Sequence, residues 1–162
     1  MNITHGIQIG ASAERLYHAL TTREGIGGWY TPETKAESKV GGIVECAFGD
    51  YGALKFRVDQ LEPNRRVAWT VVQGPPEWMD TRITFEIVED EGQVEFEFRH
   101  SGLPEQYDAY SNFNYLWGQY VRSIKLYAET GAGERSGRPG RKPRGRRPDA
   151  TVHADRRRRR SR

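Results

Sequence analysis

The sequence has very little cysteine and no long run of apolar residues. Cys46 is the single cysteine among 162 residues, which excludes an internal disulfide and a multi-cysteine metal site. No stretch approaches the roughly 20 consecutive apolar residues that a membrane-spanning helix needs. The first residues show no basic segment followed by an apolar one, so we expect no signal peptide. Together these absences favour a cytoplasmic protein.

Aromatic residues are missing from the C-terminal part of the chain, and acidic residues are scarce there. Residues 134–162 hold 13 Lys/Arg and 3 Asp/Glu, a net charge of +10, whereas residues 1–133 hold 12 and 19, a net charge of −7. All 18 aromatic residues lie before position 134. A segment with so few apolar side chains cannot offset the entropy of ordering. We therefore predict a folded domain over residues 1–133 and a disordered Arg-rich tail over residues 134–162.

The tail has the composition of a polyanion-binding segment. Residues 138–147 alternate basic residues with glycine and proline, and residues 156–160 are five consecutive arginines. Such charge binds phosphate backbones through counterion release and without reading sequence, so non-specific binding of nucleic acid or another polyanion is one expectation. Two alternatives stay open: the tail has no specific role, or it folds back on the acidic domain and screens its charge.

Alternating apolar and polar residues predict strands over most of the domain. The hairpin around residues 90–92 (DEG) has the clearest pattern, because one face of each flanking strand is apolar and the other is charged. Glycine- and proline-containing turns separate the other strands. The predicted strands cover residues 3–9, 43–48, 54–59, 66–72, 82–87 and 94–100.

Helical spacing appears at both ends of the domain. Ser12 is a candidate N-cap of a short helix that follows the first strand. A second short helix up to Trp29 is disfavoured by three glycines between positions 25 and 28, a stretch that we interpret as a hinge. After Pro104, apolar residues recur every three or four positions on one long helix that Gly131 terminates. The members of this stripe are Tyr110, Phe113, Trp117, Tyr120, Ile124 and Tyr127.

The apolar stripe of the long helix must pack against other residues, and so must the apolar face of the strands. We therefore predict an α+β fold in which a curved antiparallel sheet wraps around the C-terminal helix. This order of elements resembles the helix-grip fold of the START, polyketide-cyclase and pollen-allergen superfamily (SRPBCC), and within it the branch of the activator of the heat-shock-protein-90 ATPase. The resemblance covers residues 2–131. It is carried by residues 11–21 (ASAERLYHALT), Gly41-Gly42, residues 61–70 (LEPNRRVAWT), and residues 100–104 (HSGLP) followed by Trp117, Tyr120, Ile124, Tyr127 and Gly131.

The resemblance implies an apolar cavity between the sheet and the long helix. The function that we expect first is non-catalytic binding of a hydrophobic or aromatic small molecule, whose identity the sequence leaves open. The alternative for each ring is simple core packing. The predicted lining residues all lie on inward-facing positions of strands and helix: Trp69, Phe85, Phe96, Phe98, His100, Phe113, Trp117 and Tyr120.

His100 is the one candidate for catalysis. It continues the apolar face of its strand toward the expected cavity mouth, and a histidine there could act as a general acid or base. An enzyme of the cyclase or hydrolase kind is therefore a second hypothesis, and a structural, hydrogen-bonded His100 is its alternative. If His100 lines the pocket, His100→Ala weakens binding with little change in melting temperature.

The remaining expectations are negative or rest on the family alone. Cys46 shares its face with Val44 and Phe48 and is interpreted as a small buried hydrophobe. We expect no cofactor and no metal site, because no three ligands converge at suitable spacing. A chaperone-associated protein-binding module is a third hypothesis, which the resemblance alone implies. Nothing in the sequence determines the oligomeric state.

Overall fold

A computed structural model of the chain describes residues 1–136. Its order of elements is that of an α+β helix-grip fold, as the sequence predicts. The predicted domain of residues 1–133 lies wholly within the described part. Of the predicted tail, residues 134–136 are described, and residues 137–162 lie outside the described residues.

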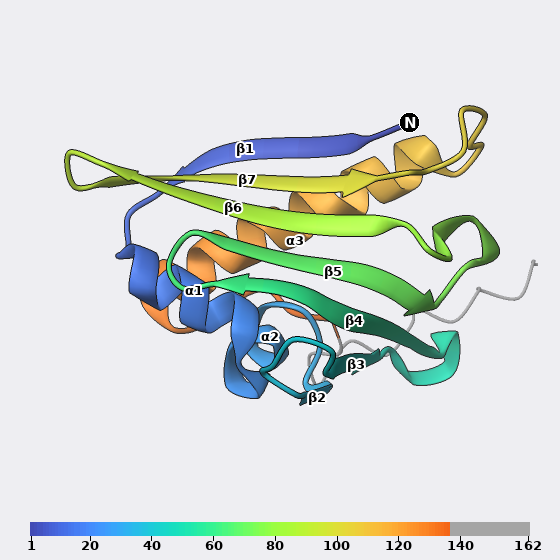
Figure 1. Ribbon diagram of the computed structural model, residues 1–162, viewed down its shortest axis with the longest axis horizontal. Helices are drawn as coiled ribbons and strands as arrows, with labels where there is room; N and C mark the ends of the chain where they lie inside the picture. Colours follow the sequence, from blue (N-terminus) through green and yellow to red (C-terminus); the bar gives the residue numbers. More distant parts are fainter. Residues whose placement is uncertain (137–162) are drawn as a thin grey trace, which may run out of the picture.

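Seven antiparallel strands form one sheet, with the spatial order β1-β7-β6-β5-β4-β3-β2. Figure 1 shows the sheet as a continuous curved layer whose edges are β1 and β2. The sequence pattern did not locate β2, because only one of its four residues is buried. The strands are β1 (Ile3–Ile9), β2 (Glu33–Ala36), β3 (Ile43–Ala47), β4 (Ala53–Glu62), β5 (Arg66–Gln73), β6 (Arg82–Asp90) and β7 (Gln93–Ser101).

Three α-helices cover the inner face and one end of the sheet. The helix α1 (Ala13–Thr21) begins at Ser12, whose Oγ accepts a hydrogen bond from the Arg15 amide at 3.1 Å, so the predicted N-cap is confirmed. The helix α2 (Arg23–Trp29) follows directly. The long helix α3 (Tyr110–Thr130) ends at Gly131, which adopts φ of 83°. It runs behind the sheet in Figure 1, while α1 and α2 lie at the lower end. Two short 3₁₀ helices, η1 (Gly49–Tyr51) and η2 (Pro76–Trp78), lie between strands.

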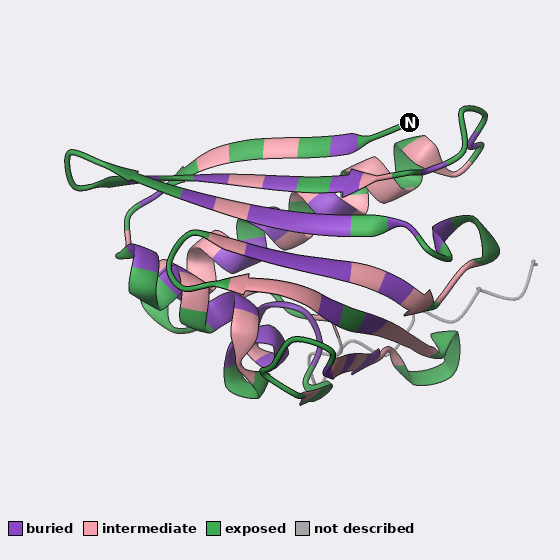
Figure 2. Cartoon of the chain, in the orientation of Figure 1, coloured by how far each residue is buried: buried purple, intermediate pink, exposed green. Residues whose placement is uncertain are grey.

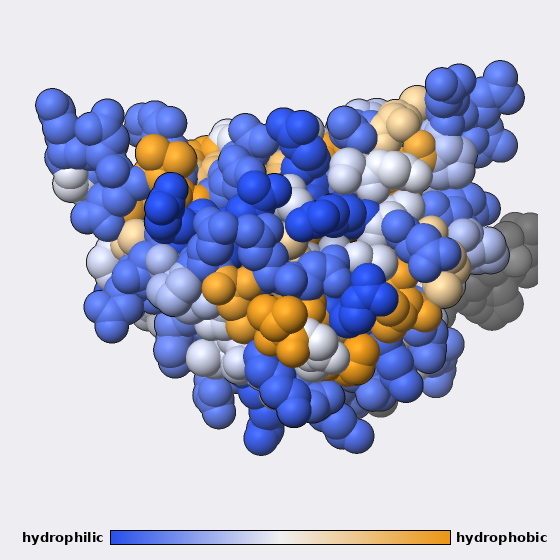
Figure 3. All heavy atoms as spheres, viewed as in Figure 1, coloured by the Kyte–Doolittle hydropathy of each residue, from blue (hydrophilic) through white to orange (hydrophobic). Residues whose placement is uncertain are grey.

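The core lies between the sheet and these helices. Figure 2 shows buried residues alternating with exposed ones along β7, as expected of a strand with one covered face. The outward face of the sheet is largely hydrophilic in Figure 3, with a smaller group of hydrophobic residues over β3 and β4. Within the described residues, no helix is both long and apolar enough to cross a membrane.

Candidate functional site

A cavity of about 1150 Å³ opens at one end of the interface between the sheet and α3. The first half of α3 forms one wall. The opposite wall comes from the ends of β3, β4 and β5 and from three connections: α2 to β2, β3 to β4 with η1, and β5 to β6 with η2. Ser136, which follows α3, completes the lining. The cavity therefore depends on segments from almost the whole length of the domain.

Seven aromatic side chains line this cavity. Tyr30 is the centre of one group, because its ring meets Tyr120 edge-on at 4.6 Å and Phe48 at 5.0 Å between ring centroids. Trp78 is the centre of the other group and stacks on Trp117 at 5.8 Å. Edge-on and offset rings of this kind stabilise one another beyond their area of burial. The seven are Tyr30, Phe48, Tyr51, Trp78, Phe113, Trp117 and Tyr120.

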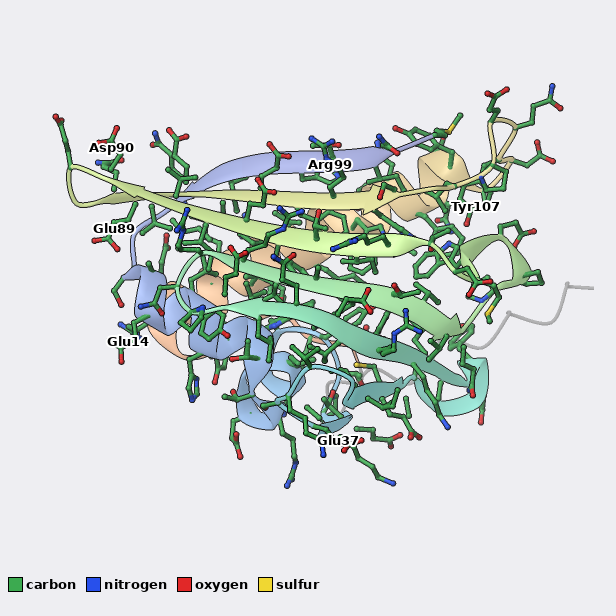
Figure 4. All side chains as sticks on the ribbon, viewed as in Figure 1. Glu14, Glu37, Glu89, Asp90, Arg99 and Tyr107 are labelled. Carbon is green, nitrogen blue, oxygen red and sulfur yellow. The ribbon has the colours of Figure 1, made fainter. Side chains whose placement is uncertain are left out.

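Local hydrogen bonds fix Trp78 in the wall. The proline-containing connection after β5 forms η2, which ends at Trp78. Its indole Nε1 donates to the hydroxyl of Tyr107 at 2.8 Å, and its carbonyl accepts a hydrogen bond from the Thr81 hydroxyl at 2.5 Å. Figure 4 shows Tyr107 at this end of the molecule, far from Glu89 and Asp90 on the hairpin between β6 and β7. These two hydrogen bonds therefore fix the position of Trp78 in the cavity wall.

The residues after α3 close the cavity on its other side. The Ser136 amide donates to the Tyr30 carbonyl at 2.9 Å, and the hydroxyls of Ser136 and Tyr120 lie 2.5 Å apart. Further back, the Glu134 amide donates to Ser123 Oγ at 2.8 Å. Fixed structure thus continues three residues beyond the predicted domain end at 133. We call residues 131–136 the C-terminal strap.

The cavity offers few polar groups. Glu33, exposed at the start of β2, carries the only formal charge among the described lining residues. The side-chain amide of Gln73 donates through Nε2 to the Ala53 carbonyl at 3.1 Å, and the Thr31 hydroxyl donates to the Ala47 carbonyl at 2.7 Å. These two donors are therefore already used within the protein.

Besides the exposed Tyr51, two buried or half-buried tyrosines, Tyr30 and Tyr120, bring their hydroxyls to the cavity as neutral polar groups. Burial raises the pKa of Tyr30 well above its usual value, and the neighbouring Cys46 and Tyr120 raise it further. Burial also raises the pKa of Tyr120, although the hydrogen bond with Ser136 partly offsets this effect. Both phenols are therefore protonated at neutral pH and can donate or accept a hydrogen bond.

His100 lies behind the cavity wall and is fully buried. Thr81 uses its proton on the Trp78 carbonyl, so it must accept the hydrogen bond from His100 Nε2 at 2.7 Å. The ring is therefore the neutral tautomer with its proton on Nε2, and burial lowers its pKa to about 4. Trp78 and Trp117, which both line the cavity, contact it edge-on at 4.7 and 6.1 Å. Among the described residues, none forms a hydrogen bond with its Nδ1.

The structure separates the eight predicted lining residues into two groups. Phe113, Trp117 and Tyr120, all from α3, line the cavity. The other five are not part of its lining and have exposed fractions of 0 or 1%. They fill the core between sheet and helix: Trp69, Phe85, Phe96, Phe98 and His100.

Core packing explains why the strand residues do not reach the cavity. Phe85 lies in the middle of this group, with ring centroids 4.9 Å from Trp69, 5.7 Å from Phe98 and 6.2 Å from Phe96. Phe98 in turn contacts Trp117 at 4.5 Å. These rings therefore support the cavity wall from behind.

Sequence reasoning missed Tyr30, Phe48, Trp78 and Ser136 as lining residues. Each lies in or beside a connection rather than on a regular strand face. Trp78 follows the Gly74-Pro75-Pro76 break, and that break was the one available signal for a rigid, ordered connection. Periodicity cannot find such residues because it reports only on helices and strands.

The glycines of α2 are sites of close packing, and this corrects their interpretation as a hinge. A Cβ at Gly28 would overlap the Tyr127 ring, and one at Gly25 would lie 2.6 Å from the backbone of Ala19. The C-terminal strap also passes close by, because a Cβ at Gly133 would lie 2.8 Å from the Gly28 carbonyl. Small residues here let α1, α3 and the strap approach α2.

Cys46 is fully buried, as the sequence predicts for a small hydrophobic side chain. Burial raises the pKa of its thiol to about 12, so the reactive thiolate is negligible at neutral pH. Within residues 1–136, no three His, Cys, Asp or Glu side chains gather in a way that could hold a metal ion.

Comparison with known proteins identifies the family of this chain. The family model described as "Activator of Hsp90 ATPase homolog 1-like protein" matches residues 10–129. No curated protein matches the chain. Many solved structures do, among them three that cover most of it.

The solution structure of the Aha1 dimer from Colwellia psychrerythraea is 35% identical, with a TM-score of 0.75 over 82% of this chain and 99% of the other. A protein from Staphylococcus saprophyticus is 22% identical, with a TM-score of 0.68 over 85% and 98%. A protein from Mesorhizobium loti is also 22% identical, with a TM-score of 0.67 over 78% and 95%. The chain therefore belongs to the family of activator of Hsp90 ATPase homolog 1-like proteins.

Proposed function

We propose that this protein binds a hydrophobic or aromatic small molecule in the cavity without transforming it. The observation that carries the proposal is a cavity of about 1150 Å³ lined by seven aromatic side chains. Ligand sites are typically large, mostly apolar hollows with a few polar groups, and this cavity fits that description. The hydroxyls of Tyr30 and Tyr120 are the groups that would orient the ligand.

An enzyme that uses His100 as acid or base has less support. Such a residue must come within hydrogen-bond reach of the reacting molecule. His100 is fully buried, donates to Thr81 and lies behind Trp78 and Trp117. Proton transfer between His100 and a molecule in the cavity would require both tryptophans to move.

The test is ligand retention and ligand binding by the full chain. Native mass spectrometry of protein purified from its own host should show a bound lipophile. The neutral fluorophore N-phenyl-1-naphthylamine should bind the purified protein, and Phe113→Ala should weaken its binding by about tenfold, because one half-buried aromatic ring of the cavity lining is lost from the contact. The matched control is Tyr115→Ala, which removes a ring from the same helix that is 66% exposed and outside the cavity. Equal binding by both variants would refute the proposed site.

Chaperone association is a second candidate function, favoured by the family description and by 35% identity to the Aha1 dimer. The same likeness makes a homodimer the oligomeric state to test first. Co-purification of a chaperone with the full chain, from the native host and at physiological salt, would support this function, and its absence would count against it.

For residues 134–162 we propose non-specific polyanion binding in the cytoplasm, supported by their net charge of +10. A salt titration of DNA binding should show a steep loss of affinity for the full chain. A chain ending at Ser136 should bind DNA at least tenfold more weakly. Equal binding by the two proteins would contradict this role.

A further inference from the structure

We infer that the cavity binds an uncharged molecule with a carbonyl group, and that Tyr30 selects this molecule by donating its phenolic proton to the carbonyl oxygen. The inference rests on the proposed function and deepens it, because it names the chemical class of the ligand and the residue that recognises it. Three features support it: the free hydroxyl of Tyr30, the fixed position of its ring, and the lack of positive charge in the described lining.

The Tyr30 hydroxyl has no hydrogen-bond partner among residues 1–136, although the residue is only 2% exposed. The hydroxyl of Tyr120, by contrast, is already engaged with Ser136. Tyr30 lines the cavity, and its hydroxyl is not sealed inside the protein, so it faces the open space. Within the described part of the chain, the sealed side-chain polar atoms without a partner are Arg66 Nε, His100 Nδ1 and Trp117 Nε1.

Packing fixes the direction in which this hydroxyl points. The Tyr30 ring stacks on Trp29 at 4.8 Å between centroids, and Phe48 and Tyr120 contact it edge-on at 5.0 and 4.6 Å. Its carbonyl also accepts the hydrogen bond from the Ser136 amide at 2.9 Å. A polar group held in this way loses little conformational entropy when a ligand binds.

The proton of this hydroxyl requires an acceptor on the ligand. Burial raises the pKa of Tyr30 well above its usual value, so the phenol is neutral at pH 7 and has one proton to donate. Buried donors are left unpaired less often than acceptors, because an oxygen has two lone pairs and can leave one unused. A ligand that accepts from Tyr30 therefore satisfies it better than one that donates to it.

The acceptor should be uncharged. None of the described lining residues is Lys, Arg or His, and Glu33 contributes a negative charge at the exposed start of β2. Transfer of an unpaired carboxylate into an apolar cavity is strongly unfavourable, whereas a ketone, ester or amide oxygen loses far less hydration. A carbonyl oxygen is thus the acceptor that fits both the free proton of Tyr30 and its surroundings.

The test uses the full chain and two uncharged fluorophores of one skeleton. The first is the ketone 6-propionyl-2-(dimethylamino)naphthalene. The second is its 6-propyl analogue, in which a methylene group replaces the carbonyl. Tyr30→Phe removes the free hydroxyl and keeps the ring, and the matched control Tyr51→Phe removes the hydroxyl of a lining tyrosine that is 98% exposed. Fluorescence titration gives the affinity of each protein for each probe.

Tyr30→Phe should bind the ketone about fivefold more weakly, which is the effect of one neutral hydrogen bond, and should bind the propyl probe as tightly as the natural sequence does. Tyr51→Phe should leave both affinities unchanged, because water already satisfies its hydroxyl. Tyr30→Phe should also keep the urea midpoint of the natural sequence. A clearly lower midpoint would show that the protein itself uses this hydroxyl and would overturn the inference.

Two further results separate failure of the inference from failure of the proposed function. If Tyr30→Phe binds the ketone unchanged, or loses affinity equally for both probes, the inference is wrong. The proposed function still stands in that case if Phe113→Ala weakens binding of the propyl probe. If neither probe binds, or Phe113→Ala affects neither, the proposed function fails and the inference fails with it.

Discussion

His100 donates a hydrogen bond to Thr81 at 2.7 Å, and the same threonine hydroxyl donates to the carbonyl of Trp78. This chain of two bonds links the buried end of β7 to η2 in the cavity wall. A histidine that appears catalytic from its place in the sequence is thus part of the support for an aromatic wall. The arrangement leads to predictions about stability that are separate from binding.

His100→Ala should destabilise the protein by about 3 kcal/mol, because it removes a fully buried ring and leaves Thr81 without its donor. Urea unfolding at pH 7.5 measures this change in the free energy of unfolding. The matched control is His18→Ala, which alters an exposed histidine and should change stability by less than about 0.5 kcal/mol. A fully stable His100→Ala protein with weakened ligand binding would instead support direct contact between His100 and the ligand.

The low pKa of His100 should make the free energy of unfolding depend on pH between about 4 and 6.5. The folded pKa is about 4 and the ordinary value is 6.5, so between these limits the unfolded state binds more protons. The free energy of unfolding therefore rises with pH across this window, by about 3 kcal/mol in total, and His100 contributes no further change above it.

The measurement for this pH effect is urea unfolding between pH 4 and 7.5, for the natural sequence and for His100→Gln. The other histidines are present in both proteins, so the difference in slope isolates His100. The variant should lose less stability on acidification. Parallel pH profiles for the two proteins would show that His100 is not a buried neutral base.

Gly28→Ala should destabilise the protein by about 2 kcal/mol, because its new methyl group would overlap the half-buried Tyr127 ring, which would have to move. Gly6→Ala is the control, since nothing lies within 4 Å of a Cβ at that strand position. Thermal unfolding of both variants gives the comparison. A Gly28→Ala protein as stable as the control would favour the hinge interpretation over close packing.

The folded part of the chain should extend at least to Ser136, beyond the predicted domain end at residue 133. A chain of residues 1–136 should retain the stability of the full chain. A chain of residues 1–133 should lose about 1–2 kcal/mol, because Ser123 Oγ, the Tyr30 carbonyl and the Tyr120 hydroxyl lose the hydrogen-bond partners that Glu134 and Ser136 supply. Denaturant unfolding of the two truncated chains decides between these ends, and equal stability would show that the strap contributes nothing.

The sequence predicted the fold because its main signals are periodic. The alternation before and after residues 90–92 and the stripe from Tyr110 to Tyr127 both report which face is buried. The strand β2 was not predicted, because four residues with a single buried side chain show no alternation of apolar and polar residues. The packing of Gly28 against Tyr127 was not predicted either. The sequence argument used the low helix propensity of glycine, which is a local property, whereas this packing is a tertiary contact.

The cavity could be predicted only in part. The three residues from α3 were found because the helical stripe faces the cavity along its first half. The strand rings Trp69 and Phe85 share the same inward face, and the sequence holds no information on which part of that face is filled and which is open. Tyr30 and Trp78 come from connections, where only the folded chain brings them to the site.

The most direct test of the central claim uses the four tryptophan indole N–H signals in a ¹H–¹⁵N spectrum of the full chain, titrated with N-phenyl-1-naphthylamine. Trp78 and Trp117 line the cavity, whereas Trp29 and Trp69 are buried outside its lining. Binding in the cavity should produce saturable shifts of the Trp78 and Trp117 signals, with those of Trp29 and Trp69 nearly unchanged. Shifts centred on Trp69, or no saturable shift of any indole signal, would contradict it.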